Sequence, residues 1–396
     1  MPFSSKVKNI PGKLFKFACL ILLVLFINAC SIDLKKHFSS NETEMARDWP
    51  RTDFSKRSFE FDEIVYQALP KDAIPAIDKP VFKKPSDIGW INPDEPVIVV
   101  KQGDQAKAYP LQIMIHHEIV NDYINNAPIV VTFCPLCNAA LVFSREVKGQ
   151  VLDFGTSGSL RKSDLIMYDR QTESWWQQFI GKGIVGHYNS VQLEFIPSKL
   201  IAYADFVKAY PQGEVLSRET GYTRLYGQNP FRGYDDINSS PFLFFDPHDK
   251  RLPPMERVLA VSQTNKHRIY PLTVLKNRPV INDKFGSLPL VILSKQGMLS
   301  VVDEEWIEDS RHIPAAAGYD RRIAGYTLTF LQQNGLILDE QTGTTWNLLG
   351  QGISGPLAGK NLRLADRGVH FAFAWLTFQP ATEIYAGDIQ HPTQRK

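Results

Sequence analysis

Short runs of apolar and β-branched residues recur along the chain from about residue 60 onward. Clear examples cover residues 97–100, 129–133 and 141–143, and similar runs return at 290–293 and 326–330. Runs of this length, bounded by Gly, Pro, Asn and Asp, are typical of β-strands. The pattern therefore predicts a mainly β protein, a β-rich α+β fold with few short helices.

Local signals refine this picture at three places. The string Glu146-Val147-Lys148-Gly149 lies between two apolar runs and predicts a hairpin turn. Residues 199–210, which end before Pro211, predict one short helix. Residues 111–120 are expected to form a strand beside residues 129–133, so that neighbouring side chains on it point to opposite faces.

The amino terminus has a different pattern. An apolar run over residues 17–27 follows a lysine-bearing start and ends in Ile27-Asn28-Ala29-Cys30. This run is short for a bilayer span but has the length of a signal-peptide core. Its end resembles the lipobox of bacterial lipoproteins, in which the cysteine is diacylated after cleavage. An uncleaved anchor is the alternative.

We therefore expect residues 1–29 to be a lipoprotein signal peptide and Cys30 to be the lipid-bearing residue that anchors the chain in a membrane. The polar residues 30–58 are expected to form a flexible tether. These features predict a lipid-anchored protein of the cell envelope, facing the periplasm or the exterior. Ser31, which stands where sorting signals of the inner membrane carry aspartate, favours the outer membrane if the host has two membranes.

The rest of the chain shows an internal repeat. Tyr109-Pro110-Leu111 recurs as Tyr270-Pro271-Leu272, and several further pairs keep nearly the same offset. Such self-similarity predicts two related β modules, 59–212 and a degenerate copy at 255–386, followed by a tail at 387–396. The connecting segment 213–254 is expected to drape over them. The further pairs are Asn121 and Asn282, Asp169 and Asp339, Thr172 and Thr342, and Trp176 and Trp346.

Charge and cysteine content narrow the function classes. The formal net charge is +2 and no basic run occurs, which gives no electrostatic case for nucleic-acid binding. Of the four cysteines, Cys19 lies in the leader and Cys30 at the lipid site. Cys134 and Cys137 are therefore expected to be the free thiols of the mature protein, in an oxidising compartment.

The repeat supplies an internal comparison, since features present in one copy alone are candidates for function. The string Cys134-Pro135-Leu136-Cys137 has no counterpart in the second copy, and His117 and Glu118 are replaced there by Arg278 and Pro279. Two sulfurs at this spacing can bridge each other or bind one ion. Two thiolates and one imidazole would suit zinc or copper, and Glu118 would be a fourth ligand or the base for a bound water.

A second feature of the first copy alone is the stretch 155–164, predicted to be a loop. Its hydroxyls and exposed amides could cradle an anionic cofactor or an unknown small ligand, assisted by an arginine. A plain surface loop is the alternative. The residues assigned to this cradle are Ser157, Ser159, Arg161 and Asp164.

Several strings together resemble one bacterial family. They are Pro70–Asp78, His117-Glu118-Ile119-Val120-Asn121-Asp122, Thr132-Phe133-Cys134-Pro135-Leu136-Cys137, Ser163–Arg170, and Leu252-Pro253-Pro254 before Glu256–Leu259. They look like the family known as domain of unknown function 3179, over about residues 60–386. The resemblance brings no settled activity. Because the family string begins at His117, it favours His117 over His116 as the metal ligand.

Three functions remain open from the sequence. The favoured one is metal binding, with copper or zinc held by His117, Cys134 and Cys137 and with Glu118 acting on a bound water. A thiol-disulfide protein that uses the Cys-x-x-Cys pair is the second. A non-catalytic envelope module with a structural disulfide is the third.

Overall fold

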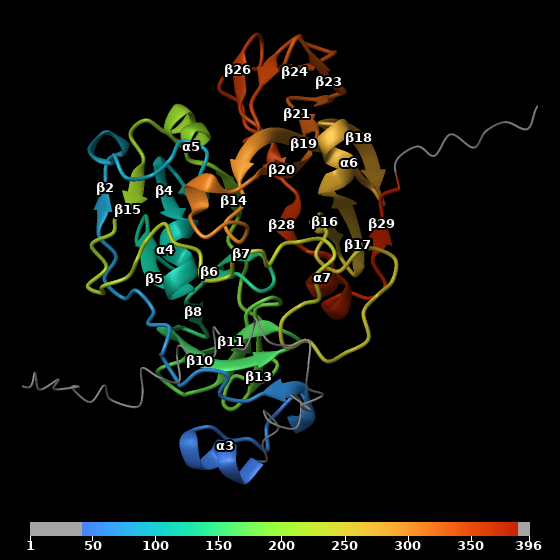
Figure 1. Ribbon diagram of the computed structural model, residues 1–396. Helices are drawn as coiled ribbons and strands as arrows, with labels where there is room; N and C mark the ends of the chain where they lie inside the picture. Colours follow the sequence, from blue (N-terminus) through green and yellow to red (C-terminus); the bar gives the residue numbers. More distant parts are fainter. Residues whose placement is uncertain (1–41, 387–396) are drawn as a thin grey trace, which may run out of the picture. The chain divides into compact units, whose positions relative to one another are not determined.

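Strands form most of the protein. The computed structural model describes residues 42–386, and Cys30 and the predicted leader lie outside these described residues. The helices are short and few, which confirms the mainly β prediction (Figure 1). No helix in the described range is both long and apolar enough to cross a bilayer. The α-helices are α3 Glu42–Asp48, α4 Leu111–His117, α5 Tyr203–Ala209, α6 Leu272–Asn277 and α7 Ala372–Phe378, and the 3-10 helices are η1 Phe61–Glu63, η2 Pro85–Asp87 and η3 Ile307–Asp309.

The first half of the chain builds three main sheets. One has the strand order β14-β3-β4-β15-β2, the second is the meander β5-β6-β7, and the third has the order β1-β10-β11-β12-β13. The strands are β1 Ile64–Val65, β2 Phe82–Lys83, β3 Pro96–Gln102, β4 Gln105–Pro110, β5 Ile119–Ile124, β6 Ala127–Cys134, β7 Ala139–Ser144, β10 Phe154–Arg161, β11 Asp164–Asp169, β12 Trp175–Gln177, β13 Lys182–Val185, β14 Ser198–Ala202 and β15 Glu214–Leu216. The predicted hairpin is confirmed: β8 Glu146–Val147 pairs with β9 Gln150–Val151 across Lys148 and Gly149, both at positive φ.

The second half follows a similar plan. Its main sheets have the orders β28-β16-β17-β29, β18-β19-β20-β27 and β23-β24-β25-β26. The strands are β16 Arg257–Gln263, β17 Lys266–Pro271, β18 Val280–Phe285, β19 Leu288–Leu299, β20 His312–Asp320, β21 Arg322–Ile323, β22 Tyr326–Thr327, β23 Phe330–Gln333, β24 Leu336–Asp339, β25 Thr345–Trp346, β26 Gly352–Ser354, β27 Arg363–Leu364, β28 Asp366–Phe371 and β29 Glu383–Ile384.

The paired positions of the repeat make equivalent contacts. Trp176 Nε1 donates to Asp169 over 2.9 Å, and Trp346 Nε1 donates to Asp339 over the same distance. These buried side chains hold turns in both halves, as residues that serve the fold should. Origin by duplication stays a prediction. Two further pairs match: Tyr109 with Asp122 and Tyr270 with Asp283, and Asn121 with the Phe154 carbonyl and Asn282 with the Phe330 carbonyl.

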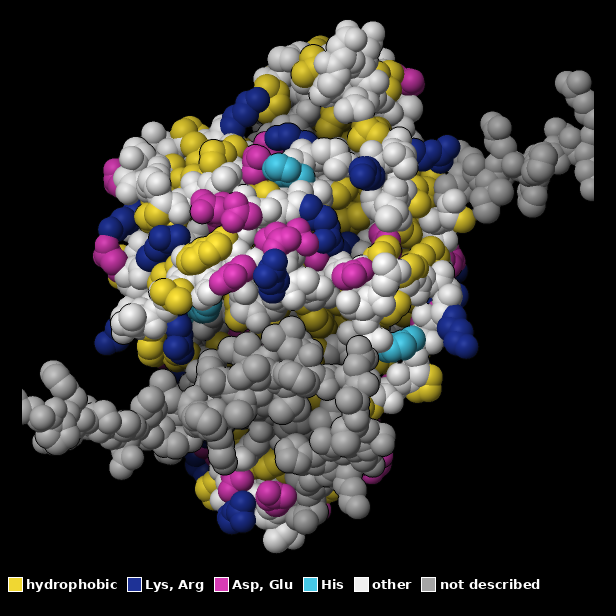
Figure 2. All heavy atoms as spheres, in the orientation of Figure 1, with side chains coloured by type: hydrophobic (Ala, Val, Ile, Leu, Met, Phe, Trp, Pro, Cys, Tyr) yellow, Lys and Arg dark blue, Asp and Glu magenta, His cyan; other side chains and the backbone are white. Residues whose placement is uncertain are grey.

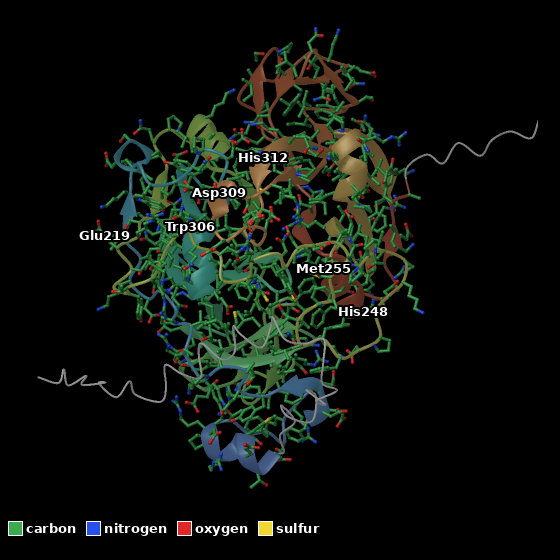
Figure 3. The ribbon with its side chains drawn as sticks, viewed as in Figure 1. Glu219, His248, Met255, Trp306, Asp309 and His312 are labelled. Atoms are coloured by element: carbon green, nitrogen blue, oxygen red, sulfur yellow. The ribbon has the colours of Figure 1, made fainter. Side chains whose placement is uncertain are left out.

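The two halves share their hydrophobic interior. The largest core cluster joins residues of β6 and β7 to residues of β16, β28 and α7. Polar contacts join the halves at the surface too, where His312 lies 3.0 Å from Asp94 and Lys295 pairs with Asp205 (Figure 3 labels His312). Each half therefore completes the core of the other.

The predicted tether is wrong over its described part, residues 42–58. Helix α3 buries Met45, and the following residues bury Trp49 and Phe54. The Trp49 ring makes edge contacts with Tyr168 at 5.0 Å and Trp175 at 5.2 Å, measured between ring centroids. This segment packs on the β10–β13 sheet because its aromatic residues outweigh its polar composition.

Two local predictions also need correction. Residues 111–117 form helix α4 rather than a strand, so the alternation of faces expected for His116 and His117 does not apply. The predicted loop 155–164 is mostly strand β10, which pairs with β11 and carries a bulge between Thr156 and Leu160. The predicted helix over 199–210 is shorter, since β14 extends to Ala202.

The connecting segment runs along both halves. Its strand β15 pairs in parallel with β4, and further on Tyr234 Oη donates to the Leu136 carbonyl over 3.1 Å. Asn229 Nδ2 donates to the Glu304 carbonyl over 2.9 Å.

On the face drawn in Figure 2, acidic and basic side chains are interspersed, which fits the near-neutral composition.

Candidate metal centre

The end of helix α4 places Glu118 against strand β6. Glu118 takes a left-handed conformation, with φ of 58°, and its N–H donates to the Met114 carbonyl over 2.7 Å. Its own carbonyl accepts from the Phe133 N–H over 2.8 Å. Both backbone groups are therefore satisfied, and the carboxyl side chain is held in the buried space beside the end of β6.

The Cys-x-x-Cys string forms the turn between β6 and β7. Cys134 is the last residue of β6 and pairs with Ala139, and the turn closes through Asn138 at φ of 50°. The thiol of Cys137 donates to the Ser163 carbonyl over 3.4 Å. Both cysteines are free and fully buried.

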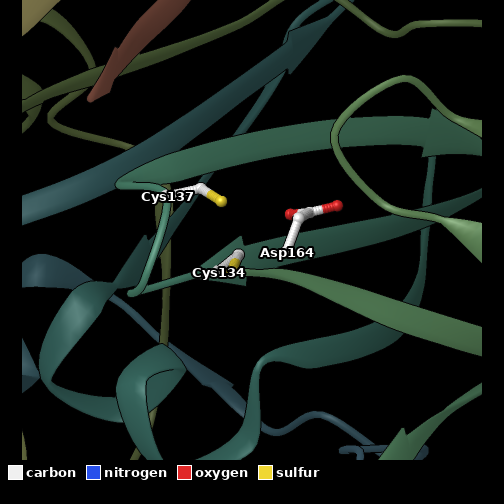
Figure 4. A group of neighbouring side chains, drawn as sticks. All are labelled: Cys134, Cys137 and Asp164. Carbon is white, nitrogen blue, oxygen red and sulfur yellow. The ribbon is translucent and has the colours of Figure 1, made fainter. Parts of the chain in front are cut away.

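Asp164, the first residue of β11, completes a cluster with the two thiols. One ligand atom from each of Cys134, Cys137 and Asp164 lies within 4.8 Å of the others (Figure 4). Asp164 Oδ2 accepts from Gln177 Nε2 over 2.6 Å and from the Phe179 N–H over 3.0 Å. Oδ1 is buried and accepts from no nitrogen or oxygen donor, and the two thiols stabilise the ionised carboxylate by hydrogen bonding. A buried carboxylate oxygen in this state is costly unless a donor or a cation fills the gap.

Burial raises the pKa of every acidic group in and beside this cluster. It raises the pKa of Glu118 to about 8, and the negative charge of Asp164 adds to the shift. Burial also raises the pKa of Asp164 to about 6 and the pKa values of both thiols, to well above the ordinary range for Cys137. Four acidic groups thus share one water-poor space, which favours either bound protons or a cation.

The structure does not bring His117 into the cluster. Its Nδ1 lies 2.7 Å from the Pro75 carbonyl and its Nε2 lies 2.7 Å from the Tyr226 hydroxyl. Because a carbonyl only accepts, Nδ1 carries the proton and Nε2 accepts from the tyrosine. His116 is also engaged elsewhere, with Nε2 3.0 Å from the Gln228 carbonyl. The interpretation of His117 as a metal ligand needs correction, because both its ring nitrogens are occupied.

Comparison with known proteins gives a family but no activity. A family model described as a protein of unknown function, DUF3179, matches residues 71–382. The chain belongs to the DUF3179 family. This confirms the resemblance seen in the sequence. Searches among curated proteins and among solved structures found no match.

The other residues assigned to an anion cradle have partners within this DUF3179 protein. Ser157 Oγ donates to the Ile166 carbonyl over 2.6 Å, and Ser159 Oγ accepts from the Gln67 N–H over 3.0 Å. Arg161 pairs with Glu63 over 2.8 Å. The hydroxyls stabilise the bulge of β10 instead of facing an open loop. Only Asp164 of this set joins the cysteines.

Segments from outside the first half close the cluster. The Phe371 N–H donates to the Cys137 carbonyl over 3.0 Å, and Asn138 Nδ2 donates to the Val369 carbonyl over 3.2 Å. Ser163 Oγ donates to the Phe242 carbonyl. Strand β28 and the connecting segment therefore fix the turn that carries the thiols. The cluster of the DUF3179 protein is a closed site.

Sequence reasoning missed the role of Asp164 as a partner of the cysteines. Its position next to the thiols depends on the pairing of β10 with β11 and on the Cys137 contact to Ser163. The available signal was that Asp164 follows a stretch present in the first copy alone, as the Cys-x-x-Cys string is. Its acidity, which argues against an anion cradle, fits a cation site.

Proposed function

We propose that this DUF3179 protein binds a transition-metal ion through Cys134, Cys137 and Asp164, with zinc favoured over copper. The supporting observation is that one ligand atom from each of Cys134, Cys137 and Asp164, a carboxylate oxygen in the last case, lies within 4.8 Å of the others and that all three residues are buried. The sulfurs and this oxygen converge from two segments far apart in the sequence. Both thiols hydrogen-bond to the Asp164 carboxylate in the protonated state, and a cation would replace these protons.

The donor set decides between the two metals. Zinc accepts thiolate and carboxylate ligands together in tetrahedral sites. Copper(I) prefers soft ligands such as thiolate and thioether, and the hard carboxylate oxygen of Asp164 does not suit it. Glu118, whose pKa responds to the charge of Asp164, lies outside the set of ligand atoms within 4.8 Å of one another, so it would become the fourth ligand only after its carboxylate moves closer. A bound zinc ion supplies Lewis acidity, and burial of all four residues favours a structural ion.

A thiol-disulfide function is less well supported. Reactive cysteines have a lowered thiol pKa and an exposed sulfur. Here burial raises the pKa values of Cys134 and Cys137, and both side chains are inaccessible. These thiols are poor nucleophiles at neutral pH in this state.

Metal analysis of the purified full-length protein tests the proposal. We expect one zinc ion per chain after purification under reducing conditions with metal supplied, and a thiolate-to-metal charge-transfer band when cobalt replaces zinc. Glu118 and the two thiols have raised pKa values, so zinc must displace their protons, whereas Asp164, with a pKa of about 6, is already ionised at pH 8. The apparent affinity should therefore fall by about tenfold per pH unit, for each proton displaced, as the pH is lowered from 8 towards 6. A protein that stays metal-free at pH 8 would overturn the proposal.

We further propose that the protein is anchored in the cell envelope by a diacylated Cys30. The support is the apolar run over residues 17–27 and the string Ile27-Asn28-Ala29-Cys30. Metabolic labelling with palmitate should mark the wild-type protein and not the Cys30→Ala variant. Equal labelling of the two proteins would exclude the anchor.

A further inference from the structure

A cavity of about 440 Å³ lies between the two halves of the chain, apart from the metal centre. From the first half, β7 and the residues before β14 line it. From the second half, the β16–β17 turn and strands β27 and β28 line it. None of Cys134, Cys137, Asp164 and Glu118 lines it. Cavities of this size accept small organic molecules.

Three arginines line this cavity: Arg322, Arg363 and Arg367. Arg322 and Arg363 both pair with Asp320, over 2.7 Å and 2.6 Å, so one carboxylate fixes two guanidinium groups. Arg367 forms no ion pair with any residue between 42 and 386, and its guanidinium lies 4.8 Å from the centre of the Phe195 ring. The arginines thus bring more positive charge than Asp320 neutralises.

Asp366, the one acidic residue of the lining, is already engaged. One of its oxygens accepts from the Gly318 N–H over 2.6 Å and the other accepts from the Gly368 N–H over 2.9 Å. The half-buried Lys199 and the exposed Arg367 also interact electrostatically with it. Asp366 and Asp320 together offset two of the three arginines, so the cavity keeps a surplus of positive charge.

The remaining walls are apolar or carry hydroxyls. Phe195 and Leu288 present rings and methyl groups, while Ser262 and Thr264 add hydroxyls at the β16–β17 turn. Guanidinium groups bind carboxylate and phosphate through two parallel hydrogen bonds. A ligand that satisfies both kinds of wall has an anionic head and an apolar body.

We propose that this cavity is a binding site for a small organic oxyanion, a carboxylate or a phosphate monoester that carries an apolar chain. Arg322 and Arg363 are held in place by Asp320 before the ligand arrives, which reduces the entropy lost on binding. Arg367 closes on the anionic head from the other side, and Phe195 contacts the apolar body. This site is independent of the proposed zinc ion.

Calorimetric titration of the full-length protein tests this inference with four probes: hexyl phosphate, hexanoate, hexanol and inorganic phosphate. We expect at least one of the two amphiphilic anions to bind at least tenfold more tightly than both hexanol and inorganic phosphate. A stronger response to hexyl phosphate identifies the head as a phosphate, and a stronger response to hexanoate identifies it as a carboxylate. If hexanol bound as tightly as the amphiphilic anions, the arginines would have no role in binding. If inorganic phosphate bound as tightly, the ligand would need no apolar chain.

A pair of variants locates the site. Arg367→Gln should weaken binding of the preferred anion by about tenfold or more, because a charged donor is lost. Arg232→Gln is the matched control, since Arg232 is an exposed arginine that pairs with Glu304 outside the cavity. Arg367 is exposed, so its replacement should leave the circular dichroism spectrum unchanged. Equal affinities in the two variants, or no anion binding in the wild type, would refute the proposal.

Discussion

Replacing Asp164 with asparagine is expected to abolish stoichiometric zinc binding, whereas replacing His117 with glutamine is expected to leave it intact. A carboxylate oxygen of Asp164 lies in the cluster with both thiols, and both ring nitrogens of His117 have other partners. Loss of a direct ligand should exceed the roughly 10–100-fold loss of affinity that follows removal of an outer partner. Competition with a chromogenic chelator measures both affinities.

These two variants separate the ligand set indicated by the sequence from the one indicated by the structure. Asn at position 164 keeps an acceptor for Gln177 and changes the volume little, so the fold should tolerate it. The thermal unfolding temperature of each metal-free variant serves as the control for folding. Loss of zinc in His117→Gln together with retention in Asp164→Asn would contradict the proposed centre.

Replacing Trp49 with alanine is expected to lower the free energy of unfolding by about 3–5 kcal/mol, the usual cost of truncating a buried aromatic side chain. Trp49 is 1% exposed and packs against Tyr168 and Trp175. The ammonium group of Lys71 also lies 4.1 Å from the centre of its ring. Urea unfolding, followed by far-ultraviolet circular dichroism, measures the change.

The neighbouring Arg47→Ala variant is the matched control. Arg47 belongs to the same segment, but its side chain is 71% exposed and pairs with the adjacent Asp48. Its replacement should leave the stability close to that of the wild type. Wild-type stability in Trp49→Ala would mean that residues 42–58 behave as the tether that the sequence predicted.

The fold class was predictable because most strands are short apolar runs bounded by turn residues. The β8–β9 hairpin illustrates this, since Lys148-Gly149 supplies two positive φ values between paired residues. Helix α4 was not predictable in this way. Its residues Leu111–Ile115 are all buried, so no polar face marks a helical period.

Strand β10 was missed for a related reason. Its residues Thr156–Ser159 are small and polar, and their hydroxyls bond to backbone groups of β11 and of the segment around residues 67–74. Gly158 takes φ of 76°, and a Cβ there would meet the Leu69 carbonyl. Because two backbones come so close here, the strand carries small residues that are typical of a loop.

The cluster of Cys134, Cys137 and Asp164 was half predictable. Cys134 and Cys137 are adjacent along the chain, so the asymmetry between the two copies was enough to select them. Asp164 reaches them only through long-range strand pairing, which the sequence does not specify. The segment 42–58 shows the same limit of composition, because its polar majority concealed the aromatic residues that dock it on the sheet.

Two hydrogen bonds, from Phe371 to Cys137 and from Asn138 to Val369, join the second half to the turn that carries the cysteines. The second half contributes no sulfur and no carboxylate to the centre, yet its strand β28 holds the cysteine turn in place. An amino-terminal fragment ending near residue 212 would retain every ligand and still present them on an unsupported hairpin, open to water and oxidants. The second half thus acts as a brace for the turn that carries the two cysteines.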